Sequence, residues 1–215
     1  MKISRKMNEN LKIDKVFLFY IALLAISGFF IFLSASLGLL ARDEEIFQSI
    51  ALKQLMNLIL GIFAFIVVSN THYRMFRKHA FYILLFAIFL NILIFIPGLS
   101  ISHGGASRWI DLGFMTFQPS EFLKIGFIIY FSAWLSGLKE KIALFKYSSL
   151  AYLIIIAILG AMLVFQKDTD TFAVIALTGL IMLFISGARY KHIFALILIL
   201  IGLFISYISI YGYAR

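Results

Sequence analysis

The stretch HGGASRWIDLGFMTFQPSEFLK, residues 103–124, is the most polar connection in a chain built mainly from runs of Phe, Leu and Ile. It brings Arg108, Trp109, Asp111, Glu121 and Lys124 close together in sequence. Long apolar runs flank it on both sides. Charged side chains are costly inside a bilayer, so their concentration in one connection predicts a membrane protein with its polar chemistry at one membrane boundary.

Composition supports a membrane protein. Of the 215 residues, 63% are hydrophobic and 13% are charged, and the mean hydropathy is +1.02. Soluble domains are only about half apolar. The net charge of +9 does not indicate nucleic acid, because the basic residues fall mainly in short loops between apolar runs. The chain has no cysteine, and its four histidines are scattered, so we expect no thiolate chemistry and no histidine-based metal site.

The apolar runs predict an all-α polytopic fold. A helix needs about 20 apolar residues to cross a hydrocarbon layer of roughly 30 Å. By this measure the chain has seven candidate spans, at residues 16–40, 50–69, 79–97, 121–138, 147–165, 171–187 and 192–210. The first run is too long for a cleavable signal peptide. We therefore divide the chain into a basic tail, residues 1–15, and a transmembrane helical domain, residues 16–215.

The loop charges predict the orientation. Alternate loops are basic, and they occur at residues 1–15, 70–78, 139–146 and 188–191. By the positive-inside rule these loops and the N-terminus are cytoplasmic. The remaining loops, which include residues 98–120 and 165–170, then face outward.

Within residues 103–124, the first half predicts a turn followed by an interfacial segment. Gly104 and Gly105 permit a tight turn, and Trp109 suits the headgroup level of the membrane. Arg108 has two interpretations. It clamps a phosphate in a bidentate manner, or it extends to ordinary lipid headgroups.

The second half predicts the start of a helix near Pro119. Proline is favoured in the first helical turn, and Ser120 and Glu121 suit the same end. Lys124 follows one turn later and shares a face with both. It either pairs with Glu121, which neutralises both charges, or forms the cationic wall of a cavity for an anionic headgroup.

A second polar segment, FQKDTDTF at residues 165–172, lies on the same predicted side of the membrane. Asp168 or Asp170 is expected to cap the following helix, with Thr171 in its first turn. If the helices form a bundle, Asp168 would share an outward-facing pocket with Arg108 and Lys124. Periodicity alone does not establish that convergence.

These residues resemble the signature of the SEDS family, the FtsW/RodA/SpoVE group. The family pattern is approximately G-x-x-R-W-I-x-L-G, a short gap, and Q-P-S-E-F-x-K. The matching positions are Gly105, Arg108, Trp109, Ile110, Leu112, Gly113, Gln118, Pro119, Ser120, Glu121, Phe122 and Lys124. Residues 166–171 depart from the family's Q-P-D-x-G-T, since Lys167 replaces proline and Asp170 replaces glycine.

The resemblance implies a peptidoglycan glycosyltransferase in the bacterial cytoplasmic membrane, a multi-pass protein that polymerises lipid II during cell division or elongation. Family members have about ten transmembrane helices and roughly twice this length, with the catalytic aspartate in a large loop after the seventh helix. That aspartate is expected beyond Arg215, so we expect this chain to be an N-terminal portion and leave its catalytic residue unknown. The substrate-binding residues implied are Arg108, Gln118, Ser120, Glu121, Lys124 and Asp168.

The resemblance also implies partners and cofactors. The expected partners are lipid II, a class B penicillin-binding protein and other divisome or elongasome membrane proteins. We expect no tightly bound cofactor, although a divalent cation, Mg²⁺ or Mn²⁺, would assist departure of the diphosphate.

Two other functions stay open. A flippase for a lipid-linked precursor would also use charged residues in a membrane cavity, but it predicts charges distributed through the depth of the bilayer. The other alternative is an inactive, truncated membrane scaffold that only binds partner helices.

Overall fold

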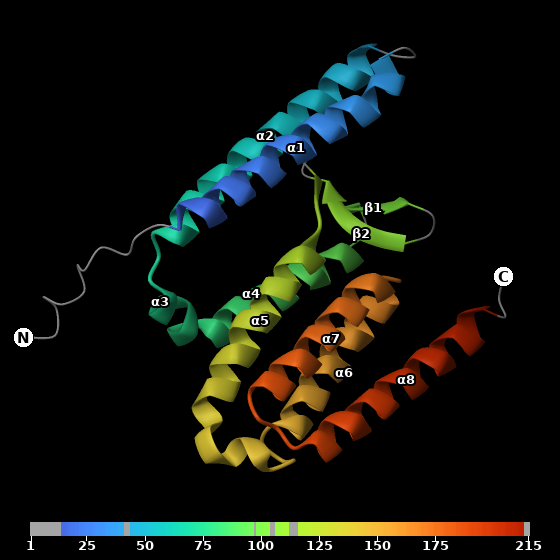
Figure 1. Ribbon diagram of the computed structural model, residues 1–215. Helices are drawn as coiled ribbons and strands as arrows, with labels where there is room; N and C mark the ends of the chain where they lie inside the picture. Colours follow the sequence, from blue (N-terminus) through green and yellow to red (C-terminus); the bar gives the residue numbers. More distant parts are fainter. Residues whose placement is uncertain (1–13, 41–43, 97, 104–105, 112–115, 213–215) are drawn as a thin grey trace, which may run out of the picture. The chain divides into compact units, whose positions relative to one another are not determined.

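The structure is a computed structural model that describes residues 14–40, 44–96, 98–103, 106–111 and 116–212. The chain divides into two units, residues 1–70 and 71–215. Most described residues are helical (Figure 1). The all-α prediction therefore holds for the bulk of the chain, and a small sheet is added to it.

The first unit is a pair of long helices, α1 (Lys15–Leu40) and α2 (Glu44–Ser69), which lie side by side. Both are apolar around most of their circumference, and most of their described large side chains are exposed. A helix that is hydrophobic on all sides is typical of a membrane span, because lipid covers the surface that water cannot.

The second unit contains the packed core. Its elements, in chain order, are α3 (Tyr73–Lys78), α4 (Ala80–Ile92), η1 (Leu93–Phe95), β1 (Ser100–His103), β2 (Ala106–Asp111), β3 (Thr116–Phe117), α5 (Pro119–Leu138), η2 (Lys139–Ala143), α6 (Ser149–Phe165), α7 (Thr169–Ile185) and α8 (Tyr190–Gly212). Because α4 to α8 run alternately up and down, each end of this bundle collects a different set of loops (Figure 1).

Aromatic side chains fill the centre of the bundle. Phe127 and Phe131 of α5 and Tyr152 of α6 are fully buried. The Tyr152 hydroxyl donates to the Ala176 carbonyl at 2.7 Å, which satisfies the one polar atom of this buried ring. Gly179 of α7 leaves the space that the rings occupy, since a Cβ there would lie 2.4 Å from Tyr152 Cε2. The three helices thus pack at a distance that only glycine allows.

The seven predicted apolar segments all become helical, but their lengths differ. Three helices are long and apolar enough to cross a membrane, at Lys15–Leu37, Phe47–Ser69 and Pro119–Ala143. The other four apolar helices, at Ala80–Phe95, Ser149–Phe165, Thr169–Ile185 and Tyr190–Ser206, are shorter in the part of the chain described. The number of seven spans and the orientation stay predictions.

A small antiparallel sheet stands where the sequence predicted only a turn and an interfacial segment. Its strand order is β1-β2-β3, with Ile101 opposite Trp109 and Ile110 opposite Phe117. Successive side chains of a strand point to opposite faces of the sheet, so Ile110 is buried while its neighbour Trp109 is exposed. The turn predicted at Gly104 and Gly105 lies outside the described residues. The sheet carries Arg108 to the end of the bundle where α5 and α7 begin.

Candidate functional site

Arg108, on β2, meets the connection between α6 and α7. Its Nη1 lies 3.8 Å from Asp168 Oδ1 and 3.9 Å from Asp170 Oδ2, and its Nη2 donates to the Lys167 carbonyl. The Asp168 side chain is 2% exposed and the Asp170 side chain 89%. The guanidinium is therefore shared between a buried and an exposed carboxylate, and it joins two segments 59 residues apart.

Of the two residues predicted to cap this helix, Asp168 and Asp170, the Asp168 carboxylate caps α7. Its Oδ1 accepts from the Thr171 backbone N–H at 3.5 Å. A negative side chain at this position satisfies a free amide and interacts favourably with the helix dipole. Asp168 thus has two neighbours of positive character, the α7 N-terminus and Arg108, which accounts for a carboxylate in a buried position.

Two buried amides connect the same end of the bundle. Asn91 Nδ2 donates to the Ala87 carbonyl at 2.9 Å and to the Pro119 carbonyl at 3.0 Å, and Gln166 Nε2 donates to the Asn91 carbonyl at 3.2 Å. These bonds link α4, the start of α5 and the end of α6. We call Asn91, Arg108, Gln166 and Asp168 the polar cluster.

Each member of the polar cluster also has a buried atom without a protein partner among the described residues. These atoms are Asn91 Oδ1, Arg108 Nε, Gln166 Oε1 and Asp168 Oδ2. Buried polar atoms normally have partners, so this end of the bundle has unfilled capacity for water or for the polar groups of a ligand.

The α6–α7 connection takes a Schellman geometry. The Asp168 N–H donates to the Leu163 carbonyl at 2.8 Å, and the Lys167 N–H donates to the Val164 carbonyl at 3.0 Å. Lys167 has a positive φ of 58°, which glycine adopts more readily than lysine. Proline, whose φ is fixed near −65°, does not fit this backbone. The departure from the family pattern at Lys167 is therefore matched by a local conformation that excludes proline.

The helix start predicted near Pro119 is confirmed, since α5 begins at that residue. Just before it, Gln118 Nε2 donates to Ser120 Oγ at 2.9 Å, and Ser120 is buried. These two predicted site residues therefore bond to each other at the first turn of α5.

Glu121 and Lys124 form an ion pair one turn into α5. Lys124 Nζ lies 2.8 Å from Glu121 Oε2 and donates to Glu121 Oε1 at 2.9 Å. Both side chains are partly exposed, and such pairs contribute little to stability. The ion pair is one of the two arrangements that the sequence left open. It does not exclude an anion, which would compete with Glu121 for the ammonium group.

The six predicted residues thus form three separate pairs, Arg108 with Asp168, Gln118 with Ser120, and Glu121 with Lys124. Their convergence on one substrate cavity stays a prediction. The sequence alone predicts no role for Asn91 or Gln166 in joining the helices. An asparagine near the end of an apolar helix is the signal that points to Asn91, because an amide in lipid must find a partner.

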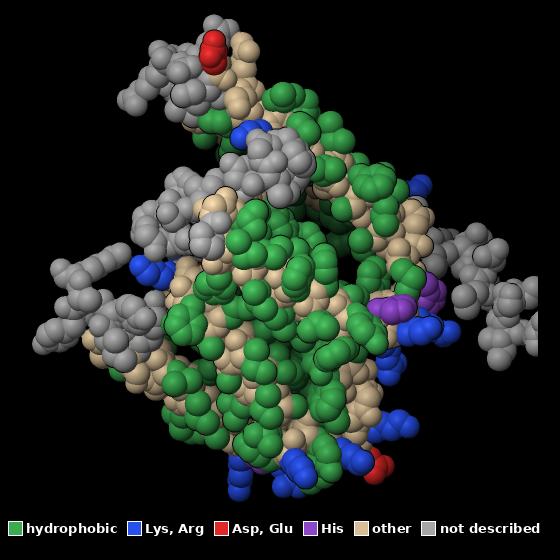
Figure 2. Space-filling view, turned by 180° about the vertical axis from the view of Figure 1, so that it is seen from behind, with side chains coloured by type: hydrophobic (Ala, Val, Ile, Leu, Met, Phe, Trp, Pro, Cys, Tyr) green, Lys and Arg blue, Asp and Glu red, His purple; other side chains and the backbone are tan. Residues whose placement is uncertain are grey.

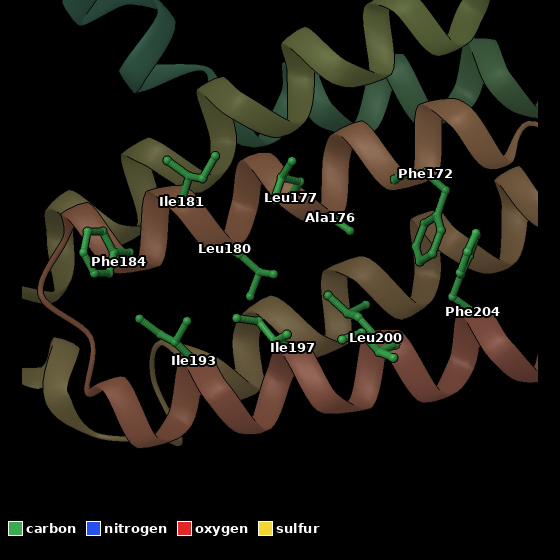
Figure 3. Close-up of a pocket in the computed structure, with 12 residues that line it drawn as sticks. Phe172, Ala176, Leu177, Leu180, Ile181, Phe184, Ile193, Ile197, Leu200 and Phe204 are labelled. Carbon is green, nitrogen blue, oxygen red and sulfur yellow. The ribbon is translucent and has the colours of Figure 1, made fainter.

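An apolar groove runs along the bundle between α7 and α8 (Figure 3). Its volume is about 500 Å³, and Phe172, Leu180, Ile193 and Phe204 are among its lining residues. Ile193 and Leu196 are buried, whereas the described side chains of α8 from Ile201 to Ile205 are exposed. Helix α8 is therefore packed at its first turns and leaves an apolar surface further along, which suits a hydrocarbon chain.

The described residues do not provide a ready metal site. No group of three or more His, Asp or Glu side chains is close enough to hold an ion in the described segments. The carboxylates of the site are each paired with a cation, Asp168 and Asp170 with Arg108 and Glu121 with Lys124. These donors do not fit a resident metal, and no chemical step is assigned to one.

Comparison with known proteins shows the family. The model for the FtsW/RodA/SpoVE family, described as cell cycle protein, matches residues 14–215. The chain therefore belongs to the SEDS family, whose members are membrane proteins.

Among similar proteins is a probable peptidoglycan glycosyltransferase FtsW from Geobacter sulfurreducens, 36% identical over 64% of this chain and 37% of the relative. The corresponding FtsW of Trichlorobacter lovleyi is 30% identical over 88% of this chain and 50% of the relative. Stage V sporulation protein E of Bacillus subtilis is 29% identical over 70% of this chain and 40% of the relative. The aligned part of the chain thus spans half or less of each of these relatives.

Proposed function

We propose that this chain forms the lipid II-binding part of a peptidoglycan glycosyltransferase at the outer face of the bacterial cytoplasmic membrane. The main observation that supports this function is that Arg108 of the family signature pairs with Asp168 at one end of the bundle, beside the start of α5. The names of the relatives support the reaction class.

Arg108 would bind the diphosphate of lipid II. In the structure its guanidinium is held by Asp168 and Asp170, and a diphosphate would compete with these carboxylates for it. Arg–phosphate bonds are bidentate and strong, and the diphosphate carries more charge than either carboxylate. Asp168 would keep Arg108 in position between turnovers, while the exposed Asp170 would be displaced first.

Lys124 would supply a second positive charge, and Glu121 would hold it until substrate binds. Gln118 and Ser120, at the first turn of α5, would donate to or accept from the headgroup. The catalytic base, which activates the acceptor sugar hydroxyl, is not assigned to any of these residues. A divalent cation, Mg²⁺ or Mn²⁺, would accompany the diphosphate as its counterion.

The position of the charges favours this function over a flippase. Among the described residues of α4 to α8, the charged residues of the helices lie within two turns of a helix end. A headgroup that crosses the membrane would need polar contacts through the full depth. The described distribution instead suits a protein that works on one face. In the assembled cell-wall machinery, a class B penicillin-binding protein would be the partner in division or elongation.

Lipid II binding tests the site directly. The purified chain is reconstituted in nanodiscs and titrated with fluorescent lipid II. We expect Arg108→Ala to weaken binding by about tenfold or more and Lys124→Ala by a smaller factor, because each removes a charge that would contact the diphosphate. The matched control is Lys78→Ala, which removes an exposed charge at the opposite end of the bundle.

Binding that is unchanged in both site variants would contradict the proposed site. An equal loss in Lys78→Ala would show that binding depends on net charge alone. Measured in parallel, polymerisation of lipid II is expected to be absent from the chain alone, since no catalytic base is assigned in it. Robust polymerisation would show that one of its carboxylates serves as the base.

A further inference from the structure

A second pocket lies at the other end of the bundle, far along α5 from the polar cluster. It has a volume of about 400 Å³ and lies between the last two turns of α5, the segment η2 and the last turn of α7. Its polar lining consists of Ser132, Ser136, Lys139 and Ser186. Ser132 and Ser136 are four residues apart, so they share one face of α5, and Lys139 directly follows the last residue of that helix.

Basic residues are concentrated at the same end of the second unit as this pocket, and Lys139 lines it. Exposed lysines and arginines gather at this end of the second unit, seen at the lower edge of Figure 2. They are Lys139, Lys141, Lys146, Arg189 and Lys191. Glu140 is the single acidic residue described in the segments 139–148 and 186–192. The potential at the mouth of the pocket is therefore positive, which favours an anion.

Lys139 has no ionic partner in the described part of the chain. The ion pairs found there involve Arg108 and Lys124, both at the polar-cluster end. The Lys139 ammonium group is thus available, in contrast to Lys124. The hydroxyls of Ser136 and Ser186 donate to carbonyls of their own helices at 2.9 Å and 2.6 Å. Rotation about χ1 would let each donate to a ligand instead.

The backbone at Lys139 is strained. Its φ of 47° and ψ of −122° place it in a region that glycine favours. A lysine held in such a conformation is less stable than a glycine would be, and strain of this kind is often found at binding sites. This conformation ends α5 and places Lys139 at the edge of the pocket.

The inner wall of the pocket is apolar. It is formed by Leu135, Ile142, Met182 and Ile185, of which Ile185 is exposed. A free anion gains nothing from such a wall. A molecule that combines a phosphate with a hydrocarbon chain would contact both parts of the lining.

We propose that this pocket binds the headgroup and upper acyl chain of an anionic phospholipid, such as phosphatidylglycerol, in the leaflet facing the basic loops. The phosphate would lie against Lys139 Nζ and the hydroxyls of Ser136 and Ser186. The acyl chain would lie against Met182 and Ile185. The site is separate from the proposed lipid II site and does not depend on it.

Native mass spectrometry of the purified chain in detergent tests this site. The chain is titrated with phosphatidylglycerol, with phosphatidylcholine and with inorganic phosphate. We expect one phosphatidylglycerol to bind about tenfold more tightly than phosphatidylcholine, and millimolar phosphate to displace little of it. Lys139→Gly removes the ammonium group in a residue that suits the backbone, and it should abolish the preference. Lys146→Gln, which removes a nearby charge that does not line the pocket, should retain it.

A second variant does not depend on Lys139. Ser136→Phe fills the pocket with an apolar side chain that an exposed helix face tolerates, and it should also abolish the preference. Retention of the preference in both Lys139→Gly and Ser136→Phe overturns the proposal. An equal loss in Lys146→Gln also overturns it, since binding would then follow net charge. Displacement by inorganic phosphate alone would assign the pocket to a free anion instead of a lipid.

Discussion

The two ends of the second unit differ in whether their cationic side chains are paired with carboxylates. At the polar-cluster end, Arg108 is paired with Asp168 and Asp170, and Lys124 is paired with Glu121. At the basic end, Lys139 has no carboxylate partner among the described residues. A paired cation is held in a fixed position but must be released by its ligand, whereas an unpaired one is open to any anion. At the first end selectivity comes from displacing the paired carboxylates, whereas at the second the serines and the apolar wall of the pocket would select the ligand.

The packed aromatic core lies between the two ends and fixes the positions of the helices that carry both sites. We therefore expect the largest effect from Gly179→Val, because a Cβ at Gly179 would lie 2.4 Å from Tyr152 and 2.9 Å from Phe127. Overpacking of this kind costs about 1–3 kcal/mol or more. Thermal unfolding in detergent, followed by circular dichroism, should show a large loss, and both ligand sites should weaken together.

The control for this variant is Gly202→Val in α8, where a Cβ would have no neighbour within 4 Å. It should unfold close to the wild-type temperature. If Gly179→Val is as stable as Gly202→Val, α5, α6 and α7 do not pack closely around Gly179.

A smaller effect, confined to one end, is expected from Asn91→Ala. This change removes donors to the Ala87 and Pro119 carbonyls and a link between α4 and α5, and it should cost about 2 kcal/mol. Ser148→Ala is the counterpart at the basic end, where a buried hydroxyl donates only to Leu144 of the preceding turn. It should cost less than half as much. Denaturant titration measures both, and equal costs would remove the proposed role of Asn91 in joining the helices.

The smallest effect on stability is expected at the two Schellman turns, of which one lies at each end of the bundle. Helix α6 ends with Lys167 at a φ of 58°, and α7 ends with Gly187 at a φ of 89°. In α7 the Gly187 and Ala188 amides donate to the Phe184 and Leu183 carbonyls, both at 3.1 Å. Lys167→Gly should stabilise the chain by about 1 kcal/mol, and Gly187→Lys should destabilise it by a similar amount. The same sign for both changes would contradict the positive φ at one of the two positions.

Much of this architecture can be predicted from the sequence. The apolar runs give the approximate position of each long helix, because a run of that length has few other ways to satisfy its backbone. Pro119 predicts the start of α5, and Asp168 or Asp170, with Thr171 in the first turn, predicts the cap of α7, which the structure assigns to Asp168. Both are local signals, and the structure confirms both.

The sheet and the polar cluster could not be predicted in this way. The pairing of Ile101 with Trp109 depends on a short hairpin that contains few strand-forming residues. The bond between Gln166 and the Asn91 carbonyl joins positions 75 residues apart, and no local pattern encodes such a distance. The pairing of Arg108 with Asp168 likewise joins positions far apart in the sequence, which no local pattern encodes. Long-range contacts follow from how the helices pack, which periodicity does not determine.

The affinity of Asp170→Asn for lipid II tests the central claim most directly. Asp170 is exposed, so its replacement should leave the fold intact, and it would free Arg108 from one of its two carboxylates. We predict that lipid II binds severalfold more tightly to Asp170→Asn, and that the gain disappears in the double variant with Arg108→Ala. Weaker binding by Asp170→Asn would contradict the claim that this carboxylate competes with the diphosphate for Arg108.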